Sequence, residues 1–82
     1  MALVILQSDF ARRYTGGQTQ IEVNASDYRS LVAGLERRYP GLAEQLSLGM
    51  AVAIDGEIFQ TPLLEAVGPD SEVHFLPVIG GG

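Results

Sequence analysis

The sequence predicts an α+β domain in which a mixed sheet of four to five strands is crossed by one main helix. Short apolar or alternating segments typical of strands occur near both ends of the chain, and one long segment between them has helical periodicity. The chain has 82 residues, 46% of them hydrophobic, and no cysteine, so its stability must come from one compact apolar core without disulfides. We therefore expect one domain over residues 1–77 and a flexible tail over residues 78–82.

The first two strands are predicted near the N-terminus. Residues 3–6 (LVIL) are continuously apolar, which is typical of a central strand covered on both faces. Ile21 and Val23 alternate with polar residues, as in a half-buried strand. The stretch between them, residues 8–18, is polar and joins the two strands of an expected hairpin, and its two adjacent glycines are interpreted as a flexible connection.

The main helix is predicted to follow the second strand. Asn24 or Ser26 is the expected N-cap, with Asp27 in the first turn, where a carboxylate favours the positive end of the helix dipole. Residues 40–41 (PG) stop the helix. One apolar stripe at helical spacing is expected to pack on the sheet: Tyr28, Leu31, Val32, Leu35 and Tyr39.

The remaining strands are predicted in the second half of the chain. After a short turn of helix at residues 42–48, residues 50–54 alternate in a third strand. The dipeptide at residues 55–56 (DG) is a strong hairpin signal, so residues 57–59 return antiparallel. Residues 72–76 form the last strand, which Pro77 ends. This order is that of a β-grasp fold, in which the first and last strands lie side by side, parallel and central.

Charge and hydropathy exclude several kinds of partner. The formal net charge is −5, so phosphate backbones repel the chain and nucleic acid is not an expected partner. No apolar run reaches the roughly 20 residues that span a bilayer, and no basic segment precedes an apolar one at the N-terminus. We expect a cytoplasmic protein that does not bind a membrane.

Few side chains are suited to catalysis. The single histidine, His74, alternates with the inward positions of the last strand and is expected to be solvated on the other face of the sheet. Asp55 and Glu57 flank a turn glycine, and turn chemistry explains them better than a cation site. No cysteine is available as a nucleophile or zinc ligand. We therefore predict no metal and no bound cofactor.

Two further patterns are assigned to the surface. The glycine pair at residues 16–17 matches neither a P-loop nor a G-x-G-x-x-G sequence. The arginine pairs at residues 12–13 and 37–38 are suited to an anion or a partner protein, but solvated surface charge is the favoured interpretation.

The C-terminal segment is the strongest candidate for function. Glycine lacks a Cβ atom, so the run of three glycines fits a channel too narrow for side chains. The group delivered is the carboxylate of Gly82, a poor electrophile that must first be activated, most simply by adenylation with a partner's ATP. Apolar side chains beside the tail suit docking on that partner. The predicted partner-binding residues are Leu76, Val78, Ile79 and Gly80, and a plain disordered tail is the alternative.

Four segments resemble the MoaD/ThiS family of ubiquitin-like sulfur carriers. They are residues 35–42 (LERRYPGL), 52–57 (VAIDGE), 70–77 (DSEVHFLP) and 77–82 (PVIGGG). The tail aligns without a gap on the family's usual P-P-V-[AS]-G-G, although Val78 replaces a common proline and Gly80 a small residue. The loop at residues 14–18 looks more like that of the carriers used in cysteine biosynthesis.

This resemblance implies a specific chemistry. An E1-like enzyme of the MoeB/ThiF type adenylates Gly82, with Gly81 giving access, and a sulfur donor converts the acyl adenylate to a thiocarboxylate. A downstream synthase then uses the sulfur in molybdopterin, thiamine or cysteine biosynthesis. The chain is then a protein substrate and not itself an enzyme, or else the small subunit of a synthase such as molybdopterin synthase.

Two other functions remain open at this point. A ubiquitin-like modifier would join the same activated carboxylate to a target lysine, and a structural β-grasp module would use the fold without a reactive end. The absence of lysine and cysteine favours a carrier, because the activated tail meets no ammonium or thiol of its own chain.

Overall fold

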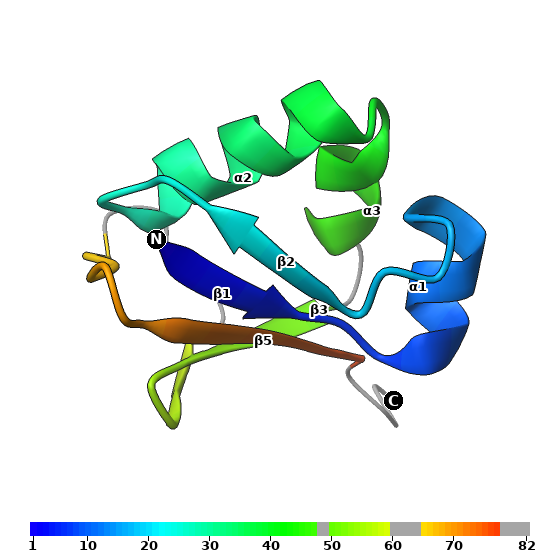
Figure 1. Cartoon of the computed structure of the whole chain (residues 1–82). Helices are drawn as coiled ribbons and strands as arrows, with labels where there is room; N and C mark the ends of the chain where they lie inside the picture. Colours follow the sequence, from blue (N-terminus) through cyan, green and yellow to red (C-terminus); the bar gives the residue numbers. More distant parts are fainter. Residues whose placement is uncertain (48–49, 60–64, 78–82) are drawn as a thin grey trace.

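A computed structural model describes residues 1–47, 50–59 and 65–77 of the chain. The sheet order is β2-β1-β5-β3-β4, with α2 and α3 over one face and α1 at one end (Figure 1). The predicted β-grasp fold, with a mixed sheet and one main helix, is confirmed. In chain order the elements are β1 (Ala2–Ile5), α1 (Ser8–Tyr14), β2 (Gln20–Val23), α2 (Tyr28–Arg38), α3 (Leu42–Ser47), β3 (Met50–Ile54), β4 (Glu57–Phe59) and β5 (Glu72–Pro77).

The first and last strands lie side by side near the middle of the sheet, as predicted. β1 and β5 are parallel, with Ile5 opposite His74, and β5 pairs antiparallel with β3 on its other side. The predicted first hairpin is present, because β1 also pairs antiparallel with β2. Since β1 and β5 run in the same direction, their C-terminal ends reach the same edge of the sheet.

The core fills the space between the sheet and α2. Leu31 and Leu35 are fully buried, and Tyr28 lies against Phe75 with ring centroids 6.1 Å apart. The predicted stripe on α2 is therefore confirmed for its three most buried members, Tyr28, Leu31 and Leu35. The largest fully buried side chains are Phe75, Leu31, Leu35, Leu42, Leu46, Val4 and Val73.

The prediction that β1 is covered on both faces is wrong for one face. Ala2 and Val4 are fully buried, whereas Leu3 and Ile5, which point to the other face, are only half-buried. A continuous apolar run does not distinguish a strand covered by helices on both faces from a strand with one face in an apolar surface. Pairing in the middle of the sheet was correctly predicted, but the cover on the second face was not.

The polar stretch between the first two strands, residues 8–18, contains a helix, α1, that was not predicted. Ala11 is fully buried, and the rings of Phe10 and Tyr14, one turn apart, have centroids 4.7 Å apart. The helix ends before the two glycines, which take positive φ angles of 66° and 94°. A helix of seven residues offers too few turns for its apolar spacing to stand out among the charged residues around it.

The N-cap of α2 is Asp27, not Asn24 or Ser26 as predicted. Asp27 is extended, at φ −149°, and its carboxylate accepts a hydrogen bond of 2.7 Å from the backbone N–H of Ser30. Asp27 also forms a β-bridge with Ala66, a contact from far along the chain that fixes where the helix begins. Hydrogen bonding from Ser30 holds the pKa of Asp27 below its usual range.

The corner between α2 and α3 is closed by one carboxylate. Glu36 accepts hydrogen bonds from the backbone N–H groups of Gly41, at 2.8 Å, and Ala43, at 2.9 Å. These bonds, the one from Gly41 first, lower the pKa of Glu36. The helix α3 agrees with the turn of helix predicted there, up to residue 47.

The predicted hairpin between β3 and β4 is confirmed. Asp55 and Gly56 take positive φ angles of 50° and 86°, and Ile54 pairs with Glu57 across the turn. The short apolar turn expected after residues 61–62 lies outside the described residues. No helix in the described parts of the chain combines the length and apolar character needed to cross a membrane.

Candidate functional site

The candidate site begins where β5 ends. Val73 and Phe75 are buried in the core, and β1 and β3 hold the strand from both sides. Pro77, the last described residue, pairs with Met50 at the end of the β3–β5 ladder. The place from which residues 78–82 continue is therefore fixed by a central strand.

Only one of the predicted site residues is among the described ones. Leu76 is half-buried, pairs with Ala51 of β3, and alternates with buried Phe75, so it lies on the sheet face opposite the helices. The other predicted site residues lie outside the described residues: Val78, Ile79, Gly80, Gly81 and Gly82.

The structure adds an apolar surface that the sequence did not predict. On the face opposite α2, Leu3 and Ile5 of β1 neighbour β5, and Ala51 of β3 lies beside Leu76. Ile58 of β4 continues this face and is 65% exposed. Side chains alternate between the two faces along each strand, but which residues of different strands share a face follows only from the strand order and register.

His74 lies on this same face, as predicted. Its side chain is 39% exposed, and its Nε2 atom lies 3.4 Å from Oε1 of Glu72. In the described ranges no group of three or more histidine, cysteine or acidic side chains is placed to hold a metal ion. The apolar side chains on this face are suited to contact with another molecule.

The opposite end of β5 is tied down by Asp55. One of its carboxylate oxygens accepts from the backbone N–H of Glu72 at 2.9 Å, and the other accepts from the hydroxyl of Ser71 at 2.7 Å. That hydroxyl oxygen accepts in turn from the N–H of Gly68 at 2.8 Å. These bonds, the one from Glu72 first, hold the pKa of Asp55 below its usual range. The Asp55 carboxylate therefore acts in the turn and in the anchoring of β5.

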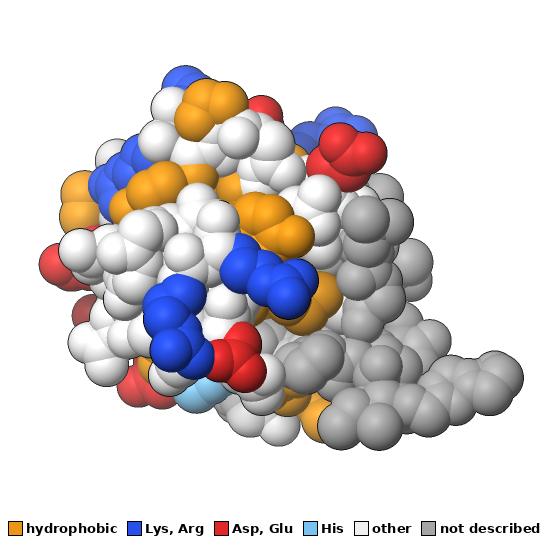
Figure 2. Space-filling model, turned by 90° about the vertical axis from the view of Figure 1, so that its right-hand side faces the viewer, with side chains coloured by type: hydrophobic (Ala, Val, Ile, Leu, Met, Phe, Trp, Pro, Cys, Tyr) orange, Lys and Arg blue, Asp and Glu red, His pale blue; other side chains and the backbone are white. Residues whose placement is uncertain are grey.

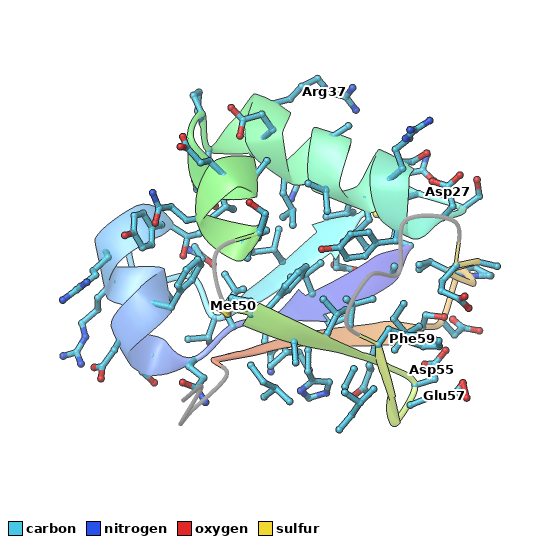
Figure 3. The ribbon with its side chains drawn as sticks, turned by 180° about the vertical axis from the view of Figure 1, so that it is seen from behind. Asp27, Arg37, Met50, Asp55, Glu57 and Phe59 are labelled. Atoms are coloured by element: carbon cyan, nitrogen blue, oxygen red, sulfur yellow. The ribbon has the colours of Figure 1, made fainter. Side chains whose placement is uncertain are left out.

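Figure 3 shows how the labelled acidic residues are placed relative to the tail. Asp27, Asp55 and Glu57 lie at one end of the molecule, and β5 ends at the other, beside Met50. The arginine pair of the sequence at residues 12–13 lies on α1, at the tail end, and the pair at residues 37–38 lies in the last turn of α2.

Comparison with known proteins identifies the family. The sequence profile of the ThiS family matches residues 9–82, which is most of the chain. This chain belongs to the ThiS family. The resemblance found in the four segments is confirmed, and ThiS-family membership makes the chain one of the small ubiquitin-like sulfur carriers and modifiers. No curated protein matches the chain significantly.

Solved structures share the fold of this ThiS-family chain. Mycobacterium tuberculosis CysO, described as an antigen, is 20% identical, with a TM-score of 0.85 over 96% of this chain and 100% of that one. CysO of Amycolatopsis orientalis, solved in a BexX/CysO complex, is also 20% identical, with a TM-score of 0.86 over 100% of both chains. The small archaeal modifier protein 1 of Methanosarcina acetivorans is 16% identical, with a TM-score of 0.81 over 99% of this chain and 95% of that one.

Proposed function

We propose that this chain is a sulfur carrier whose reacting group is the carboxylate of Gly82. On an E1-like enzyme, a carboxylate oxygen attacks the α-phosphorus of ATP, and pyrophosphate leaves. The sulfur of a hydrosulfide ion then attacks the carbonyl carbon of the acyl adenylate, and the bond to AMP breaks. The products are AMP and a thiocarboxylate, which passes its sulfur to a downstream synthase.

The observation that carries this proposal is the ThiS-family match, which runs to residue 82. The fold supports it, because the segment with the glycines continues from a strand held on both sides in the middle of the sheet. A firmly held body with a tail of five residues after Pro77 lets a partner grip the body while its active site takes the end of the tail. The tail itself spans at most about 18 Å.

Each residue of the site has a role in this proposal. Gly81 and Gly82 pass a narrow channel because they lack side chains. Leu76, Val78 and Ile79 give apolar contact with the activating enzyme, and Gly80 lets the backbone approach it closely. ATP belongs to the enzyme, so the chain itself needs no nucleotide site.

Mass spectrometry of the intact protein tests the proposal. The chain is incubated with a ThiF/MoeB-type adenylating enzyme, MgATP and sodium sulfide. We expect a mass increase equal to the exchange of one oxygen for one sulfur, and no change when ATP is left out. A variant lacking Gly82 is the matched control and stays unchanged. An unchanged wild-type mass with an enzyme that activates other ThiS-family carriers would overturn the proposal.

A second candidate is a modifier that forms an amide with a lysine of another protein. The likeness of the fold to small archaeal modifier protein 1 favours it, and the chemistry differs only in that an amine replaces sulfide as the attacking group. The same incubation with a lysine-containing protein in place of sulfide distinguishes the two. Adducts of the combined mass, less one water, support the modifier.

A further inference from the structure

The helix α1 is a rigid part of the molecule, although it interrupts a hairpin. Ala11 is fully buried, and the single hydroxyl hydrogen of Thr15, itself buried, is shared between the carbonyl oxygens of Ala11 and Gln18. The Tyr14 hydroxyl donates to Oε1 of Gln45 in α3 at 3.2 Å. These contacts hold the inner side of α1 against the rest of the fold, so its outer side has a fixed orientation relative to the sheet.

The outer side of α1 carries two arginines. Arg12 and Arg13 are exposed in the last turn, and the Arg12 side chain is 71% exposed. Arg12 pairs with Asp9, which is itself exposed, and such surface pairs exchange readily for another partner. Arg13 forms no ion pair with the parts of the chain that the structure describes. Both guanidinium groups are therefore accessible to an external anion.

The register of the sheet places this helix beside the tail. Ile5 is opposite His74 in the parallel pair, so Ser8 follows Ile5 by as many residues as Pro77 follows His74. The helix thus begins at the same edge of the sheet at which the tail leaves, and Figure 1 shows α1 at that end. In Figure 2, which faces this end, arginine side chains stand out in the middle of the surface.

Charge is distributed unevenly between the two ends of the molecule. The far end and the strand ends that meet there carry seven carboxylates and one arginine: Glu22, Asp27, Asp55, Glu57, Glu65, Asp70, Glu72 and Arg29. The remainder of the chain has four arginines against three side-chain carboxylates and the terminal carboxylate of Gly82. The negative charge therefore belongs to the end away from the tail, and the rest of the chain is close to neutral.

We infer that α1 is a docking element for the activating enzyme and that Arg12 and Arg13 bind carboxylates on the rim of the cleft that takes the tail. This inference rests on the proposed function. An enzyme that reaches Gly82 must come within about 18 Å of Pro77, so its rim faces this end of the molecule. An acidic rim attracts the arginines and repels the far end, which orients the approach with the tail in front. Guanidinium groups also pair with carboxylates through two parallel hydrogen bonds.

Two double variants with the same change of charge test the inference. R12Q/R13Q removes the arginines of α1, and R37Q/R38Q removes two exposed arginines from the end of α2, in the helical layer. Each is assayed as a substrate of a ThiF/MoeB-type adenylating enzyme by pyrophosphate release, at about 50 and about 300 mM salt. Thermal unfolding checks that both variants are folded.

We expect R12Q/R13Q to lower kcat/KM about tenfold at low salt and to remove most of its salt dependence, with kcat at saturating carrier unchanged. R37Q/R38Q should change kcat/KM less than about twofold. R12K/R13K should keep most of the wild-type kcat/KM, because lysine keeps the positive charge. Equal losses in the two glutamine variants would overturn the inference and leave sulfur carriage intact. If the wild-type chain is not adenylated, the proposed function and the inference both fail.

Discussion

The two ends of the central strand are built for different purposes. Where β5 begins, Asp55, Ser71 and Gly68 are joined by hydrogen bonds, and the N-cap Asp27 bridges to Ala66 close by. Where β5 ends, Pro77 pairs with Met50 and the chain continues into the glycine tail. The side-chain hydrogen bonds to the start of β5 make this the fastened end of the strand, and contacts with a partner at the tail end leave these bonds undisturbed.

Adding one residue after Gly82 acts on the tail end alone, and it is the largest effect we expect. The reacting carbonyl moves by about 3.5 Å, which places it outside the reach of the attacking groups. Adenylation should be abolished, as measured by pyrophosphate release, while the melting temperature stays that of the wild type. If the extended chain is adenylated at the wild-type rate, and its intact mass shows that it was not trimmed, the position of the reacting carbonyl at Gly82 is not required.

Leu35→Ala tests the core that joins the two ends. Leu35 is fully buried, so its truncation should lower the free energy of unfolding by about 2 to 5 kcal/mol, measured by urea denaturation. Val32→Ala is the matched control on the same helix, because Val32 is only half-buried and should cost clearly less. A loss below about 1 kcal/mol for Leu35→Ala would show that the Leu35 side chain does not contribute to the core as its burial indicates.

Ser71→Ala loosens the fastened end. The hydroxyl of Ser71 accepts from Gly68 and donates to Asp55, so its removal should cost about 1 to 3 kcal/mol in the same denaturation experiment. Adenylation of Gly82 should proceed at the wild-type rate, because the lost bonds are at the other end of β5. Ser26→Ala, at an exposed serine, is the control. If Ser71→Ala has the free energy of unfolding of the wild type, these hydrogen bonds do not stabilise the start of β5.

Acid should weaken the hydrogen bonds of three carboxylates, Asp27 and Asp55 at the fastened end and Glu36 at the corner between α2 and α3. The folded-state pKa values of Asp27, Glu36 and Asp55 are lowered by hydrogen bonds, so their stabilising effect is complete above the unfolded-state carboxyl pKa, about 4. It is lost as the pH falls through the lowered folded-state values. The urea midpoint should therefore decrease between about pH 5 and pH 2, and Asp55→Asn should make this decrease shallower. An identical slope in Asp55→Asn would show that Asp55 is not coupled to folding.

The elements that the sequence predicted well are those that local patterns determine. The alternation in β3 and β5, the stripe on α2 and the dipeptide at Asp55 each carry their own signal within a few residues. The helix α1 escaped prediction because its burial depends on Phe10 and Tyr14 meeting the rest of the fold. The N-cap was misplaced because a bridge to Ala66, far along the chain, decides where α2 begins.

The candidate site was predictable to a different extent. The glycines of the tail are identified by their type and by the family resemblance, without any knowledge of the fold. The apolar face around Leu76, and the position of Arg12 and Arg13 beside the tail, depend on the register between β1 and β5. That register joins the two ends of the chain, and no local pattern specifies it.

The place of β5 between β1 and β3 has a consequence for how the protein is made. Residues 72–77 are synthesised after the other four strands, yet without them the β1–β2 hairpin and the β3–β4 hairpin have no strand to join them. While the ribosome still holds this stretch, the nascent chain has two unconnected hairpins, and its sheet can close only once β5 has left the ribosome. A fragment cut before residue 72 lacks the strand that joins the two hairpins, so it cannot form this sheet.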